Sequence, residues 1–219
     1  MPTARLASVA LLAIRTQRIA LCLAPPSRWQ DLYGLGTARL ELSGAAHALS
    51  ADPLAEALAL APSVLGCPAA PLPTRWTYGP SPRHAVDRVA ADDPATAPML
   101  RFERMLPREA RAADEGASDA APLPELIAIA VYRAALDGVI HLDPQMVGAL
   151  IWAPVEALRA LTPGMRLEDA RALEGVEVVA APATPLPDDL LLYLPSDYGE
   201  RHLTRLAAKY GAGALFTAP

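Results

Sequence analysis

The stretch Asp52-Pro53-Leu54-Ala55-Glu56-Ala57-Leu58-Ala59-Leu60-Ala61-Pro62-Ser63-Val64-Leu65-Gly66 carries the signals of a capped helix with one interruption. It opens with a favourable N-cap and a proline at the first helical position, and Glu56 stands where a capping-box partner belongs. Leucines and alanines then recur with the helical period. Pro62 has no N–H for the helical ladder and Gly66 suits a C-terminal cap, so we expect the last turn to kink or end there.

Short apolar runs separated by polar breaks predict strands on both sides of this helix. The expected strands span 8–14, 19–23, 39–42, 99–106, 126–135, 148–152, 176–180 and 190–194, and further helices are expected at 154–161 and 197–210, the last with Asp197 as its N-cap. Loops are expected at 28–36, 68–73, 80–82 and 107–124, the last of which could instead form a short exposed helix. Strands and helices mix without a β–α–β rhythm, so the sequence favours an α+β fold over a doubly wound sheet.

Length and composition predict one large domain, or one domain with an appendage. The chain has 219 residues, of which 53% are hydrophobic and 20% charged, and this excludes an intrinsically disordered protein. A net charge of -5 argues against nucleic acid as a partner, and no apolar run approaches the roughly 18 residues of a membrane span. The short apolar run near the N-terminus is better explained by an opening strand than by a signal peptide.

Residue usage carries information about the source and the compartment. Lys209 is the only lysine among 19 basic residues and asparagine is absent, a bias that a GC-rich bacterial genome produces. Cys22 and Cys67 sit in apolar contexts without a CxxC neighbour, so we expect two buried thiols in a reducing, cytoplasmic environment and no zinc site. The four histidines are scattered and lack the spacing of a metal cluster.

The order of these elements resembles the start of a Nudix domain: two strands, a loop with aromatics and glycines, a short strand and a capped helix ending in Leu65-Gly66. Gly36-Thr37-Ala38-Arg39-Leu40-Glu41 stands where the family's Nudix box begins, and Ala59-Leu60-Ala61-Pro62-Ser63-Val64-Leu65-Gly66 where it ends. Val131-Tyr132-Arg133-Ala134 and Ile151-Trp152-Ala153-Pro154-Val155-Glu156-Ala157-Leu158 resemble the family's later strand and helix start. The resemblance spans residues 5–165 and implies an α/β/α sandwich with a mixed sheet over 1–175, followed by a C-terminal strand–helix extension over 176–219 that packs on, or is exchanged with, the same domain.

The departures from the family's pattern concern its metal site. Nudix enzymes hydrolyse linked nucleoside diphosphates with Mg²⁺, a hard cation that takes carboxylate oxygens from a glutamate-rich helix. In this alignment the three helical glutamates become Leu60, Ser63 and Val64, the spacer glutamate falls near Gly44, and the arginine becomes Ala59. Leucine and valine cannot ligate Mg²⁺, so the sequence predicts that the family's metal site and its catalytic residues are absent.

The first functional hypothesis is a Nudix-fold protein that has lost diphosphate hydrolysis and binds a ligand or partner, with no cofactor. The expected ligand is a nucleotide-like small molecule, because aromatic rings can stack on a base and an arginine can meet a phosphate. The candidate ligand-binding residues are Trp29, Tyr33, Arg39, Glu41 and Glu56. Each also has a structural explanation: aromatic packing against the sheet, an exposed strand arginine, or a carboxylate at the positive end of a helix.

Two other classes of function stay open. One is an active hydrolase of nucleoside-diphosphate-linked substrates with a rearranged Mg²⁺ site that uses Glu41, Asp52, Glu56 or the acids of 103–115. The other is a protein-interaction module in which residues 190–210 form a homodimer or docking surface. The charged run 108–116 resembles a glutamate helix, but its acids are misspaced and a solvated loop explains it better. A DNA-binding winged helix is disfavoured because the short tail has only three basic residues.

Overall fold

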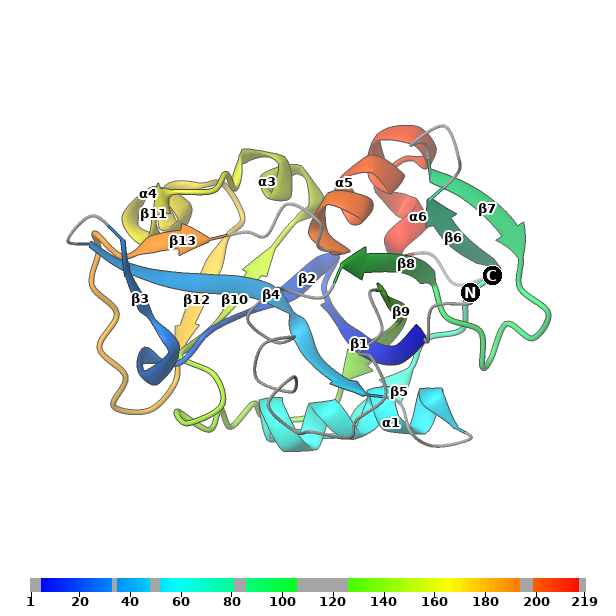
Figure 1. Cartoon of the computed structure of the whole chain (residues 1–219), viewed down its shortest axis with the longest axis horizontal. Coiled ribbons are helices and arrows are strands. Elements are labelled where there is room, and N and C mark those ends of the chain that lie inside the picture. The colour runs from blue at the N-terminus through cyan, green and yellow to red at the C-terminus, as the bar shows by residue number, and fades with distance from the viewer. Residues whose placement is uncertain are drawn as a thin grey trace, which may run out of the picture.

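A mixed sheet forms the centre of the molecule, with helices on both of its faces (Figure 1). The computed structural model describes residues 5–32, 35–47, 52–80, 86–105, 126–193 and 199–216. Its strands are β1 (Arg5–Arg15), β2 (Arg18–Leu23), β3 (Gln30–Leu32), β4 (Leu35–His47), β5 (Ala69–Pro71), β6 (Trp76–Pro80), β7 (Val86–Ala90), β8 (Leu100–Met105), β9 (Leu126–Leu136), β10 (Ala149–Ala153), β11 (Met165–Arg166), β12 (Glu177–Ala180) and β13 (Leu191–Tyr193). The helices are η1 (Pro26–Arg28), α1 (Pro53–Leu60), η2 (Ala61–Leu65), α3 (Val155–Ala160), α4 (Leu167–Ala172), α5 (Gly199–Tyr210) and α6 (Gly213–Phe216).

The sheet combines parallel and antiparallel pairings, which confirms the expected α+β class. Its strand order is β11-β13-β4-β2-β1-β9-β8-β6-β7, and β10 pairs with β2 and carries β12 on its other side. β1 runs parallel to β9 and antiparallel to β2 and β4. The first two strands form a hairpin, and its two-residue turn places Thr16 and Gln17 at positive φ, as a type I′ turn requires.

The segment before the capped helix is more regular than its sequence predicts. Only 39–42 was expected to be a strand, and 28–36 was expected to be a loop. In the structure, β3 pairs with the start of β4, and β4 continues to His47. Along its length, β4 pairs first with β13, then with β2 and finally with β1. Its register against β1 shifts at Gly44, because Leu11 lies opposite Ser43 and Ala10 opposite Ala45. These pairings join distant segments, so local sequence signals could not reveal them.

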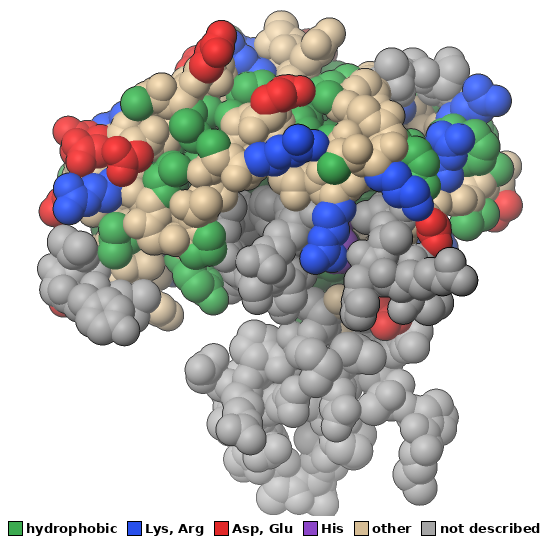
Figure 2. Space-filling view, turned by 90° about the horizontal axis from the view of Figure 1, so that it is seen from above, with side chains coloured by type: hydrophobic (Ala, Val, Ile, Leu, Met, Phe, Trp, Pro, Cys, Tyr) green, Lys and Arg blue, Asp and Glu red, His purple; other side chains and the backbone are tan. Residues whose placement is uncertain are grey.

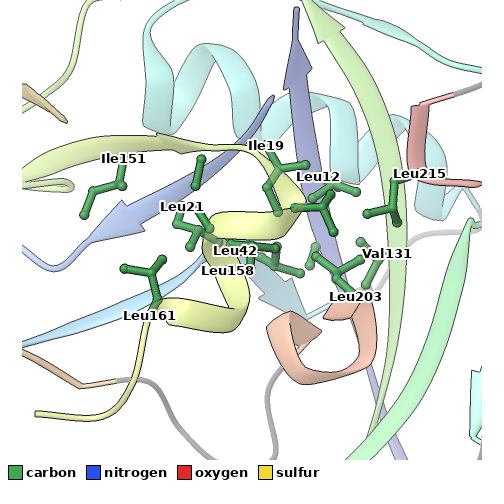
Figure 3. Packing of buried hydrophobic residues seen from close by; sticks show 14 of the residues in the cluster. Leu12, Ile19, Leu21, Leu42, Val131, Ile151, Leu158, Leu161, Leu203 and Leu215 are labelled. Atoms are coloured by element: carbon green, nitrogen blue, oxygen red, sulfur yellow. The ribbon is translucent and has the colours of Figure 1, made fainter. Parts of the chain in front are cut away.

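Two hydrophobic clusters fill the space between the sheet and its helices. Alternate residues of β1 enter opposite clusters, so both faces of this strand are buried and its sequence reads as one apolar run. Val9, Leu11 and Ala13 pack with α1 and η2. On the other face, Figure 3 shows Leu12, Ile19, Leu21, Leu42, Val131 and Ile151 of the sheet gathered around Leu158 and Leu161 next to α3 and Leu203 and Leu215 of α5 and α6.

The outer surface on the side of α3, α5 and α6 is mixed in character. Figure 2 shows charged side chains of both signs spread among hydrophobic ones on this side of the molecule. The last elements of the chain are joined to the sheet: β12 pairs with β10, and β13 pairs in parallel with β4. No helix in the described part of the chain is long and apolar enough to cross a membrane.

Several elements were missed by the sequence analysis. The segments expected as loops at 68–73 and 80–82 contain β5 and the end of β6, and β7, β11, α4 and α6 were not predicted. These strands are short: β6 pairs with β7 on one side and with β8 on the other, and β7 pairs with β6. The expected segment 107–124, the cap at Asp197 and Tyr33 lie outside the described residues.

Candidate functional site

The capped helix and the turn that follows it are used for packing. α1 begins as expected, because the Oδ1 atom of Asp52 accepts the backbone N–H of Ala55 at 3.0 Å. After Leu60 the ladder widens into the π-helical turn η2, where Pro62 has no N–H to donate, and Gly66 ends the turn at a φ of 64°. The expected interruption and C-terminal cap are therefore confirmed.

The three positions aligned with metal-binding glutamates point to structural roles. Leu60 and Val64 are each only 8% exposed and belong to the cluster between α1 and β1. Ser63 is exposed, and its hydroxyl donates to the carbonyl oxygens of Ala59 at 2.8 Å and Leu60 at 3.2 Å. That hydroxyl is thus bonded to the backbone of the preceding turn.

These residues do not fit the Mg²⁺ that the resemblance to the Nudix family implies. Mg²⁺ requires several oxygen ligands in near-octahedral geometry, usually with one or two carboxylates. In the stretch from Asp52 to Gly66, only Asp52 and Glu56 carry carboxylates, and Asp52 holds the helix cap. Across the described ranges, no group of three or more His, Cys, Asp or Glu is placed to hold a metal ion.

A cleft of about 820 Å³ opens at the other end of this helix. Its walls are the first turn of α1 and the loop 91–98, and its floor is formed by β6, β7, β8 and β9. The loop is fixed to the sheet, since the Thr77 hydroxyl donates to the carbonyl of Pro98 at 2.8 Å and the N–H of Thr74 to that of Pro94 at 2.8 Å. The cleft is thus a formed feature of the fold, within the usual volume range of a small-molecule site.

Arg101 and Tyr132 lie on the floor of the cleft. Arg101 of β8 is opposite Ala130 of β9, so Tyr132, two residues further along, is its diagonal neighbour on the same face. Tyr132 is only 4% exposed, and desolvation raises the pKa of its phenol, with a smaller opposing effect from Arg101. The phenol is therefore a neutral hydrogen-bond donor at physiological pH.

Neither group is committed to another contact. Within the described part of the chain, the Tyr132 hydroxyl and the Arg101 guanidinium form no hydrogen bond or ion pair. Both contribute to the cleft, and Arg101 is exposed there. A guanidinium beside a phenol hydroxyl offers several donors to a bound oxygen atom.

The aspartates that line the cleft differ in the hydrogen bonds and ion pairs that they form. Asp87 accepts from the ammonium of Lys209 at 2.8 Å. Asp93 accepts from the hydroxyl of Thr96 and the N–H of Ala95, and these two hydrogen bonds, in that order, lower the pKa of its carboxyl group. Asp92 is exposed and makes no contact of this kind among the described residues.

The residues predicted from the sequence fall in different places. Trp29 is half-buried, and its indole N–H donates to the carbonyl of Ala24 at 2.7 Å. Arg39 and Glu41 lie in β4, with their backbones opposite Tyr193 and Cys22. Glu56 lies in the first turn of α1, and neither it nor Trp29 lines the cleft. The structure therefore does not bring Trp29 and Glu56 together in one site.

Arg101, Tyr132 and Asp92 were missed as site residues. A strand was predicted at 99–106, and its residues Leu100 and Phe102 both belong to the cluster under α5. Side chains alternate between the two faces of a strand, so Arg101 lies on the face opposite to Leu100 and Phe102. This alternation is the signal from which the position of Arg101 could have been predicted. Nothing in the sequence showed that this face is left open beside α1.

Comparisons with known proteins give structural similarity only. No protein-family model matches the chain, and no curated protein matches it significantly. Solved structures similar to it include the E. coli ORF135 protein (13% identity, TM-score 0.40, covering 72% of this chain and 79% of that chain). They also include a NUDIX hydrolase from Nitrosomonas europaea (10% identity, TM-score 0.40, covering 72% of this chain and 77% of that chain). A MutT NUDIX hydrolase from Burkholderia pseudomallei is similar as well (15% identity, TM-score 0.37, covering 70% of this chain and 85% of that chain). Function therefore has to be inferred from the residues of this chain.

Proposed function

We propose that this chain is a Nudix-like protein that does not perform Mg²⁺-dependent diphosphate hydrolysis and instead binds a small molecule in the cleft beside α1. The resemblance rests on the order of elements along the chain: the β1–β2 hairpin, the strand β4, and a capped helix ending at Gly66. Later in the chain, strand β10 and Pro154, which is the N-cap of α3, also support the resemblance.

The observation that carries the loss of hydrolysis is the burial of Leu60 and Val64. Two of the three positions that would supply metal ligands contribute apolar side chains to the cluster under the sheet. A carboxylate at either position would lie in an apolar environment, where an uncompensated charge is strongly unfavourable. The helix is thus adapted to packing at the place where the family needs oxygen atoms.

The observation that supports binding is the set of uncommitted polar groups in a preformed cleft. Sites for small molecules combine a concave surface with a few converging polar groups. Here the Arg101 guanidinium and the Tyr132 hydroxyl supply those groups, and the cleft volume of about 820 Å³ accommodates a ligand of nucleotide size.

A hydrolysis screen tests this proposal directly. The full chain is incubated with Mg²⁺ or Mn²⁺ and with dinucleotides, nucleotide sugars or nucleoside triphosphates, and each reaction is repeated with EDTA. We expect no turnover above the level without protein. Turnover that EDTA abolishes would overturn the proposal in favour of a rearranged metal site, and Glu41→Gln, Asp52→Asn and Glu56→Gln variants would then locate it.

A further inference from the structure

We infer that the cleft recognises a small organic molecule with one anionic group, a carboxylate or a phosphate monoester, bound by Arg101 and Tyr132. This inference rests on the proposed function, because it names the class of ligand for the same cleft. The cleft lies at the first turn of α1, whereas the residues aligned with the Nudix metal site lie at the opposite end, in and near η2. The ligand site proposed here is thus separate from the aligned metal site.

The geometry of the floor favours an oxyanion. Arg101 and Tyr132 are diagonal neighbours on adjacent antiparallel strands, a relationship that places Cα atoms about 7–8 Å apart. Side chains of this length that leave the same face can reach one bound group together. The Arg101 guanidinium offers paired N–H donors that match a carboxylate or phosphate, and the neutral Tyr132 phenol adds another donor.

The availability of the Tyr132 hydroxyl is the second observation that points to a ligand. The side chain is 4% exposed and lines the cleft, and its hydroxyl has no hydrogen-bond partner among the residues that the structure describes. This oxygen is not among the fully buried polar atoms, so it is accessible from the cleft. An acceptor atom supplied by a ligand would replace water at this group.

The charges around the cleft limit the ligand to few anionic groups. The charged residues that line it, as far as the structure describes it, are Arg101 and four aspartates at positions 52, 87, 92 and 93. Lys209 offsets Asp87, but the remaining acids still outnumber the single arginine. A diphosphate or triphosphate would place further negative charge near these carboxylates, so like-charge repulsion works against polyphosphates.

The rest of the floor suits an uncharged body. The side chain of Val89 is 70% exposed and lines the cleft together with Thr77 and Gly79. A sugar ring or a base could cover this apolar and weakly polar surface while its anionic group reaches Arg101. Covering an exposed valine contributes favourable hydrophobic burial.

Two ligand series that vary in the number and kind of their anionic groups test the inference. The first is glucose, glucuronate, glucose 6-phosphate and glucose 1,6-bisphosphate, and the second is adenosine, AMP, ADP and ATP. Affinities are measured by isothermal titration calorimetry with the full chain, at low salt and in EDTA so that metal-dependent turnover is prevented. We expect the tightest binding in at least one series from the member with one anionic group. Comparison of glucuronate with glucose 6-phosphate distinguishes a carboxylate from a phosphate.

Substitutions locate the binding. Arg101→Gln should weaken the best ligand about tenfold or more, and Tyr132→Phe about three- to tenfold, the usual effects of losing a charged and a neutral hydrogen bond. Arg159→Gln in α3 and Tyr193→Phe in β13 are matched controls on exposed residues outside the cleft, and they should leave affinity unchanged. Asp92→Asn should raise the affinity of the bisphosphate or diphosphate relative to the ligand with one anionic group.

Three results would overturn the inference: a bisphosphate or polyphosphate that binds tightest in both series, no binding by any member, or an Arg101→Gln variant that binds as the parent does. Tight ATP binding without turnover would refute this ligand class and leave the proposed binding function in place. EDTA-sensitive turnover in the separate hydrolysis screen would refute the proposed function itself, whatever the order of affinities.

Discussion

The guanidinium of Arg133 donates a hydrogen bond to the carbonyl oxygen of Leu215 at 3.1 Å, joining β9 to the helix α6 across 82 residues of sequence. Its other terminal nitrogen donates to the carbonyl of Pro73, and the side chain is only 4% exposed. Burial lowers the pKa of this guanidinium, because the charged form is removed from water. One buried cation thus joins the end of the chain to the sheet and to the segment before β6.

Replacement of Arg133 by methionine should lower the free energy of unfolding by about 1–3 kcal/mol. Two buried carbonyl oxygens lose their donors, and this loss is partly offset because a charge no longer has to be buried. Urea denaturation followed by circular dichroism measures the change, and Arg159→Met on the exposed face of α3 is the control. Stability equal to that of the parent would show that water or a neighbouring group replaces the guanidinium.

A carboxylate at position 60 or 64 should damage the fold, whereas one at position 63 should be tolerated. Leu60→Glu or Val64→Glu places a charge in the cluster under β1, at an expected cost of about 3–5 kcal/mol. Ser63→Glu, at an exposed position of the same turn, should change stability by less than about 1 kcal/mol. Thermal unfolding of the three variants gives the comparison. Similar stabilities would contradict the packing role assigned to Leu60 and Val64.

Gly66→Ala should destabilise the protein more than Gly164→Ala does. Both glycines have positive φ, which costs an alanine roughly 1–2 kcal/mol. A Cβ atom on Gly66 would also overlap the backbone carbonyl of His141, whereas one on Gly164 meets nothing within 4 Å. We expect a total of about 3 kcal/mol or more for Gly66→Ala in chemical denaturation. Equal effects would mean that the loop carrying His141 moves at little cost.

Alkaline pH should reveal the buried phenol of Tyr132. Its pKa is raised, so the folded state holds the proton more strongly than the unfolded state. This contribution to stability is fully present below the ordinary tyrosine pKa of about 10 and is lost as the pH rises through the higher folded value. Tyr132→Phe should therefore show a shallower loss of stability above pH 10, by at most about 1.4 kcal/mol per pH unit. Tyr193→Phe, at an exposed position, should keep the slope of the parent.

Local signals in the sequence predicted the central elements well. The N-cap at Asp52, the break at Pro62 and the positive φ of Gly66 depend on contacts within a few residues, so they could be predicted from residue types alone. The strands β1, β2 and β9 followed from apolar runs and polar breaks in the same way. The predicted burial of Cys22 and Cys67 is also confirmed.

The candidate site could not be found in this way. Trp29 and Glu56 were chosen for their chemistry and their nearness to the helix, but the cleft is formed by strands that follow α1 in the sequence. Arg101 and Tyr132 are 31 positions apart and become neighbours only through the register of β8 against β9. The strands β6 and β7 are five residues each, and such short strands depend on their partners for stability.

The sequence by itself determined which side chains this helix carries: leucine, serine and valine at the positions aligned with glutamates, and hence no carboxylate for a cation there. Only the tertiary structure decided that Leu60 and Val64 face the core, that a cleft opens at the first turn of α1, and that Arg101 and Tyr132 share its floor. The physical reason is that residue chemistry is a local property, whereas burial and strand register are set by contacts between distant segments.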